Sequence, residues 1–133
     1  MKKTNNKGFS LVELIVVIAI MAVLIGVLAP TFTKYVEQAR RSTDIQNAEE
    51  IKQAILADIA DGVITGSATA ATVGTGGVTP STMTTIPTIQ GSINNGGNFT
   101  ATYDAVAGSC AVFNGSHELT NATAAAAYKT ATS

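Results

Sequence analysis

The chain of 133 residues has few of the residue types that hold small extracellular domains together or perform catalysis. It contains one cysteine, one histidine and no tryptophan. A single cysteine excludes a disulfide within the chain, so the folded part must be stabilised by packing, by a partner or by an assembly. We expect Cys110 to behave as a small buried hydrophobic residue rather than as a reactive thiol. The chain also offers no spaced set of cysteine and histidine ligands, and we expect no metal site and no cofactor.

Charge is scarce in the second half of the chain. Residues 1–61 carry 14 of the 17 charged side chains, and residues 62–133 carry only Asp104, Glu118 and Lys129. The net charge of −1 gives no bulk electrostatic reason to bind nucleic acid. The composition therefore describes two parts: a charged segment that contains a long apolar run, and a nearly neutral head rich in Thr, Ala, Gly, Ser and Asn.

The apolar run at residues 9–29 is long enough to cross a membrane. As one helix, its 21 residues would span about 31 Å, close to the hydrocarbon thickness of a bilayer. The preceding residues 1–8 contain three lysines and place the N-terminus in the cytoplasm. Three interpretations compete: a cleaved secretory signal peptide, an uncleaved anchor, and a chain cut just before Phe9. Pro30 follows the only small-residue site at the end of the run and disfavours the first interpretation.

Glu13 stands inside this run and needs an explanation. A charged side chain in a bilayer costs about 2.5–3.5 kcal/mol on insertion scales. Cleavage between Gly8 and Phe9 would create an ammonium four residues before Glu13. In parallel copies shifted along their axes, the Glu13 carboxylate of one chain could pair with the Phe9 ammonium of the next. The acid would then select the register of the assembly, as a polar group does in a coiled-coil core.

The segment "KGFSLVEL", followed by the apolar run and Pro30, resembles the class III signal sequence of type IV pilins and related pseudopilins. Gly8, Phe9, Glu13 and Pro30 match that pattern in type and spacing. The resemblance implies that a prepilin peptidase cleaves between Gly8 and Phe9 and N-methylates Phe9. It also implies that the assembly machinery extracts the mature chain from the cell membrane into a helical homo-oligomeric filament outside the cell.

The function that this resemblance implies is that of a structural subunit of a type IV pilus, not of an enzyme. Such surface filaments serve adhesion, twitching motility, aggregation or DNA uptake, in which nucleic acid is only an indirect partner. A pseudopilin of a type II secretion or competence system is the alternative, although the chain lacks the clustered acids of a calcium loop near its C-terminus. A membrane-anchored secreted enzyme is the alternative of another class. Its candidate residues would be Cys110, His117, Asp104 and Glu118.

The predicted fold is α+β, with a long N-terminal helix packed on a small antiparallel sheet. We expect a leader at residues 1–8, a hydrophobic membrane and filament-core helix at 9–30, an amphipathic helix at 31–61 and a globular head at 62–133. Gly26 and Pro30 weaken the helix, because Pro30 clashes with the carbonyl of Gly26. By the resemblance, this region unwinds on assembly. Gly62 is the expected C-cap.

The amphipathic half is expected to present one apolar stripe to the head. Ile45, Ala48, Ile51 or Lys52, Ile55 and Ile59 recur at helical spacing, and Asp44, Glu49, Glu50 and Asp58 are expected mostly on other faces. Arg40 and Arg41 have two interpretations. They are either solvated and paired with Glu37 or Asp44, or they contact the acids of a neighbouring subunit.

In the head, residues 62–82 are expected to form a loop rich in Gly and Thr. Strands are expected at residues 86–93, in "NFTATYD" at 98–104, at 109–113 and at 117–119, with turns at "NNGG" and at Asn114-Gly115. The tail 121–133 is expected to fray, to add an edge strand or to form one helical turn, with Tyr128 docked. Asn98, Asn114 and Asn121 begin N-x-[ST] patterns that arise easily by chance in such a composition.

Overall fold

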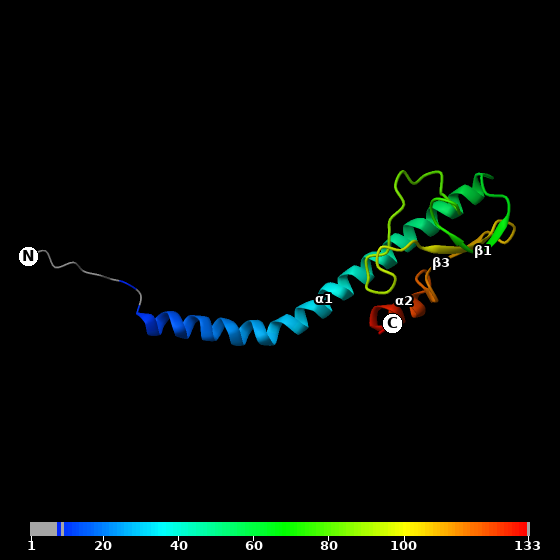
Figure 1. Ribbon diagram of the computed structural model, residues 1–133. Helices are drawn as coiled ribbons and strands as arrows, with labels where there is room; N and C mark the ends of the chain where they lie inside the picture. The colour runs from blue at the N-terminus through cyan, green and yellow to red at the C-terminus, as the bar shows by residue number, and fades with distance from the viewer. Residues whose placement is uncertain (1–7, 9, 133) are drawn as a thin grey trace, which may run out of the picture. The chain divides into compact units, whose positions relative to one another are not determined.

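The computed structural model describes Gly8 and residues 10–132. The described residues fall into two compact units, which divide between Tyr35 and Val36. Its elements follow one another as shown in Figure 1: α1 (Leu11–Ala60), β1 (Ser67–Thr72), β2 (Thr100–Asp104), β3 (Ser109–Asn114), β4 (His117–Glu118) and α2 (Ala122–Thr130). This is the predicted α+β class, with one long helix and a small antiparallel sheet.

The first unit contains the apolar part of α1. An 18-residue window of this helix has a mean hydropathy of 3.1, and none of that window is buried. The helix continues through Gly26 and Pro30, although Pro30 cannot donate a backbone hydrogen bond. Unwinding of this region during assembly therefore stays a prediction about another state. The expected start of the helix at Phe9 lies outside the described residues.

In the second unit, one face of α1 packs on the head. The helix residues that it buries lie on one face, at steps of three or four positions except for the adjacent pair Ala54 and Ile55: Arg41, Asp44, Ala48, Ile51, Ala54, Ile55 and Asp58. The predicted apolar stripe is therefore right: Ala48, Ile51 and Ile55 are buried, and Ile45 and Ile59 are partly buried and pack against the core. Asp44 and Asp58 lie on the same buried face. The expectation that these two aspartates lie on other faces is wrong. Because they lie on the buried stripe, they must find hydrogen-bond donors inside the head.

The sheet is antiparallel and has the strand order β1-β2-β3-β4. Ala101 on β2 pairs with Ala71 on β1 and with Val112 on β3. The buried residues of the head that form the core with α1 come from the sheet, from the loops around it and from α2: Val73, Val78, Ile89, Phe99, Ala101, Val112, Leu119 and Tyr128. The predicted strands 98–104, 109–113 and 117–119 are thus confirmed with small changes at their ends, and the turn at Asn114-Gly115 joins β3 to β4.

The first predicted strand is wrong. Residues 86–93 form no strand, and the strand that pairs with the other side of β2 is β1, inside the segment expected to be a loop. Ile89 has the right apolar character, but its backbone closes a local loop with Gly96 and Gly97. The next two backbone N–H groups, those of Gln90 and Gly91, donate to a helix carboxylate. They are therefore not available to a sheet.

The C-terminal end of α1 and the N-terminal end of α2 are both capped. Gly62 follows α1 with a φ of +74°, and the Val63 N–H donates to the Asp58 carbonyl, as in a Schellman motif. The tail forms α2, a helix of nine residues, longer than the single turn that was one of the expectations. The Asn121 side chain accepts hydrogen bonds from the backbone N–H groups of Thr123 and Ala124, which explains why the helix begins there.

Candidate functional site

The start of α1 contains the residues that the sequence singles out for processing and assembly. Gly8 is exposed, whereas Phe9 lies outside the described residues. The Ser10 backbone N–H donates to the Glu13 carboxylate at 3.1 Å, and the Leu14 N–H donates to the Ser10 carbonyl at 3.2 Å. Glu13 therefore caps the helix that contains it, as the glutamate of a capping box does. The pattern Ser-x-x-Glu at residues 10–13 predicts this contact, and our sequence analysis missed it.

The apolar surface that follows Glu13 is uncovered within this chain. Fourteen large apolar side chains between Leu11 and Leu28 are each 49–72% exposed. Monomeric soluble proteins rarely expose a continuous apolar surface of this extent. Transfer of this surface out of water is strongly favourable, so it must be covered by lipid or by other protein chains. The exposed carboxylate of Glu13 stands at the beginning of this surface.

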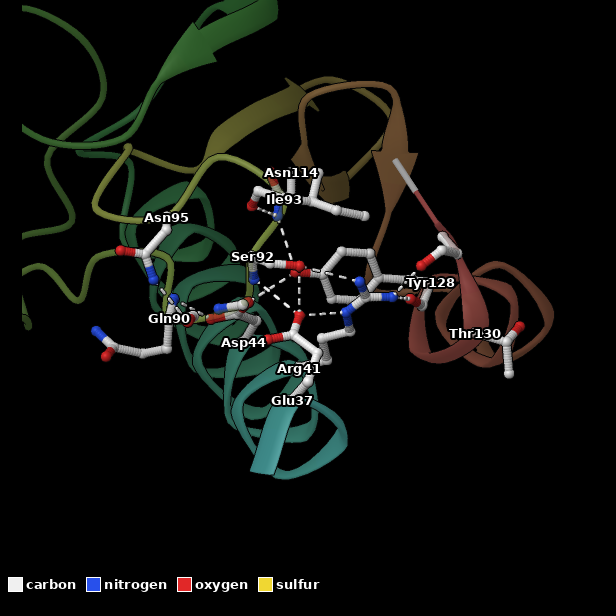
Figure 2. A network of polar contacts seen from close by, with 12 residues as sticks. Glu37, Arg41, Asp44, Gln90, Ser92, Ile93, Asn95, Asn114, Tyr128 and Thr130 are labelled. Atoms are coloured by element: carbon white, nitrogen blue, oxygen red, sulfur yellow. Dashed lines mark hydrogen bonds and ion pairs between the residues drawn. The ribbon is translucent and has the colours of Figure 1, made fainter. Parts of the chain in front are cut away.

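The second group of functional interest is a polar cluster between α1 and the head, shown in Figure 2. We call it the polar clamp, and it consists of Glu37, Arg41, Asp44, Ser92, Asn114 and Tyr128. The Asp44 carboxylate is fully buried. It accepts hydrogen bonds from the Gln90 N–H at 2.7 Å, from the Gly91 N–H at 2.9 Å and from the Tyr128 hydroxyl at 2.7 Å. One helix side chain thus holds a loop and the C-terminal helix at once.

Arg41 binds the same helix α2 from its end. Its guanidinium donates to the carbonyls of Tyr128 and Ala131 and forms an ion pair with Glu37. It also lies 5.5 Å from the centroid of the Tyr128 ring. A cation beside the last carbonyls of a helix is stabilised by the helix dipole. The clamp therefore fixes the C-terminal segment to α1, the task for which many extracellular domains use a disulfide.

Asn114 completes the clamp from the sheet side. Its buried side-chain amide donates to the Ile93 carbonyl and to the Tyr128 hydroxyl, both at 2.9 Å. At the other end of the head, the buried Asp58 accepts hydrogen bonds from the backbone N–H and the hydroxyl of Ser81. Asp58 and Asp44 thus hold the irregular segment 81–91 against α1 at its two ends.

The environment of the clamp shifts the pKa of two of its groups. Burial raises the pKa of the Tyr128 hydroxyl, and the adjacent Asp44 carboxylate raises it further. Burial alone would raise the pKa of Glu37, but hydrogen bonds from Ser92 and Arg41 outweigh it and lower that pKa below its usual value. Tyr128 is therefore a neutral donor, and Glu37 is an anion at neutral pH.

The structure decides between several of the sequence-based interpretations. Arg41 is buried in the clamp and paired with Glu37, so it is not solvated, whereas Arg40 is exposed. Asn114 is fully buried and is inaccessible to a glycosylating enzyme, and Asn121 caps α2. Cys110 on β3 is half-buried, and burial raises the pKa of its thiol to about 11.

The candidate catalytic residues have ordinary structural surroundings. The Asp104 carboxylate accepts the N–H groups of Val106 and Ala107 in the turn after β2. The His117 ring lies 5.8 Å from that of Tyr128. Among the residues that the structure describes, no group of three or more His, Cys, Asp or Glu side chains is placed to hold a metal ion.

Comparison with known proteins identifies the N-terminal segment. Residues 3–29 match the model of the prokaryotic N-terminal methylation motif. The chain is 37% identical over 68 residues to Prepilin peptidase-dependent protein A of Clostridium perfringens, a match that covers 51% of this chain and 49% of that protein. It is 30% identical over 64 residues to the Type IV major fimbrial protein FimA of Dichelobacter nodosus, which covers 48% of this chain and 40% of that protein. The matched part thus spans half or less of each relative.

No solved structure matches the chain significantly. The motif and the two relatives nevertheless confirm the resemblance drawn from "KGFSLVEL": the chain carries the class III prepilin signal, and over about half of its length it is similar to pilin-type proteins.

Proposed function

We propose that this protein is the structural subunit of a type IV pilus. A prepilin peptidase removes residues 1–8 and methylates the Phe9 amine, and the assembly machinery then polymerises the mature chain from the cell membrane into a surface filament. One observation supports this proposal above the others: a prepilin signal leads directly into a helix whose most apolar 18-residue window has no buried residue. Lipid covers that segment before assembly, and parallel copies cover it in the filament.

Glu13 gives the assembly its register. Cleavage removes three lysines, so that five Lys and Arg side chains remain against nine Asp and Glu, and it creates a new cation at Phe9. Among the described residues, the Glu13 carboxylate accepts a hydrogen bond from the Ser10 N–H, and a carboxylate has capacity for further donors. In the dry core of a filament, an unpaired carboxylate is strongly destabilising. Pairing with the Phe9 ammonium of a neighbour removes that penalty at one axial shift only.

The similarity to a major fimbrial protein favours a surface pilus as the destination of the subunit. A pseudopilin that builds a short fibre within the cell envelope is the second candidate, because the match to the prepilin peptidase-dependent protein concerns the processing step and not the destination. Electron micrographs separate the two, since long fibres outside the cell indicate a pilus.

The experiment that tests the proposal combines the mature N-terminus with one variant. Mass analysis is expected to find N-methyl-Phe9 as the first residue. Glu13→Ala is expected to accumulate in the membrane at the normal level but to form no fibres, with Glu13→Asp as the control that keeps the charge. A mature chain that begins at Met1 or at Pro30, or a normal yield of Glu13→Ala fibres, would contradict it.

A further inference from the structure

A groove in the second unit is open to solvent. It has a volume of about 600 Å³ and lies between α1 and the loop that Asp58 holds in place through Ser81. Its lining is apolar in the middle and acidic at one end: Ala54, Ala57 and Met83, with Gln53 and Thr82, and then Glu49 and Glu50. An occupant that fits this lining has an aliphatic stem and a cationic end, which is the composition of an arginine or lysine side chain.

Among the residues that the structure describes, Arg40 has no acidic partner. Its two acidic neighbours on α1 are occupied elsewhere, since Glu37 is paired with Arg41 and Asp44 is turned into the head. In the part of the chain that the structure describes, the one ion pair is that between Arg41 and Glu37. Glu49 and Glu50 therefore also have no cationic partner, and the exposed Arg40 has the charge that the groove lacks.

Arg40 cannot reach the groove of its own chain. Glu49 follows it by nine residues, which on an α-helix corresponds to about 14 Å along the axis and about 180° around it. The cation and the groove thus lie on different faces of one subunit. Complementary patches on different faces form a heterologous contact, which repeats from copy to copy instead of closing into a symmetric pair.

We propose that the groove is an interface between copies of this chain, in which it receives Arg40 of a second, parallel copy shifted along the helix axis. This inference rests on the proposed function. The guanidinium lies between Glu49 and Glu50, and its stem covers Ala54 and Met83. The shift of about 14 Å exceeds the shift of about 6 Å that brings Phe9 of one chain level with Glu13 of another. The two contacts therefore join each subunit to different neighbours.

Charge reversal tests this contact in the full chain. Arg40→Glu, and separately the double change of Glu49→Arg with Glu50→Arg, are expected to lower the yield of sheared fibres several-fold while the membrane pool of subunit stays normal. The triple variant that combines both changes is expected to restore the yield. Asp61→Arg, a reversal at an exposed acid beyond the groove, is the matched control and is expected to retain normal yield. Failure of the triple variant to recover, or an equal loss with Asp61→Arg, would overturn the inference.

Cross-linking gives a second, independent measurement. In a Cys110→Ser background, the pair Arg40→Cys and Gln53→Cys treated with a short bismaleimide in intact fibres is expected to give a ladder of covalent multimers, and neither single cysteine should give one. The absence of a ladder in fibres would contradict the contact. A failure of the proposed function would be recognised by a different result, because in that case the Glu13→Ala variant would still assemble into fibres.

Discussion

The polar clamp makes a quantitative prediction at Asp44. Asp44→Asn keeps the shape of the side chain but removes its charge and turns one acceptor into a donor. Three donors converge on this carboxylate, from Gln90, Gly91 and Tyr128, so at least one of them loses its acceptor inside the protein. A buried unsatisfied donor costs about 1–3 kcal/mol. Because Asp44 is fully buried, we expect a destabilisation at the upper end of this range, about 3 kcal/mol.

Urea unfolding of the full chain in detergent measures this loss. Near-ultraviolet circular dichroism of the tyrosines follows the packing of the head, whose Tyr128 is fully buried. With a slope of about 1–3 kcal/mol per M of urea, the transition midpoint is expected to fall by about 1–3 M. The expected loss of about 3 kcal/mol is a large part of the free energy of unfolding of a typical domain, about 5–15 kcal/mol.

The matched control is Asp61→Asn, the same chemical change at an exposed position. It is expected to change the stability by less than about 0.5 kcal/mol. If Asp44→Asn lowers the free energy of unfolding by no more than this control does, the three hydrogen bonds do not hold the C-terminal segment to α1. The account of the clamp would then be wrong.

Gly91→Ala is expected to destabilise the head by about 1–3 kcal/mol, because its Cβ would lie 2.7 Å from the Tyr128 hydroxyl; Gly66→Ala, which meets nothing within 4 Å, should be close to neutral in the same urea titration. Glu37 has a lowered pKa, so its contribution to stability is present at neutral pH and is lost as the pH falls through its folded pKa. The advantage of the wild type over Glu37→Gln should therefore shrink below about pH 4, and an undiminished advantage at pH 2 would refute this. Cys110, with its pKa raised to about 11, should react with iodoacetamide at pH 8 roughly two orders of magnitude more slowly in the folded head than in urea, and equal rates would contradict its burial.

Local signals in the sequence predicted much of the fold, and the errors come from contacts between distant residues. The turn at Asn114-Gly115 and the alternation of Phe99, Ala101 and Tyr103 located β2, β3 and β4, because hairpins depend on neighbouring residues. β1 was missed because four of its six residues are Ser or Ala, which lack the large β-branched and aromatic side chains that mark a strand. Its place in the sheet depends on pairing with β2, more than 25 residues later.

The polar clamp shows the same limit. Periodicity marks which positions of α1 face the head, and Asp44 and Asp58 fit that period as well as Ile51 and Ile55 do. Their charge suggested an exposed face, since aspartate is rarely buried without partners. Their partners are mainly backbone N–H groups of an irregular segment, and no side-chain pattern in a sequence reveals those. The N-terminal motif was predictable because its chemistry requires particular residues at a fixed local spacing.

The position of the Glu13 carboxylate in an assembled fibre tests the central claim most directly. A fibre structure that resolves the helix core is expected to place this carboxylate within about 4 Å of the N-methylated Phe9 nitrogen of a neighbouring subunit. A carboxylate that faces water there, or that has no cationic terminus nearby, would contradict the account.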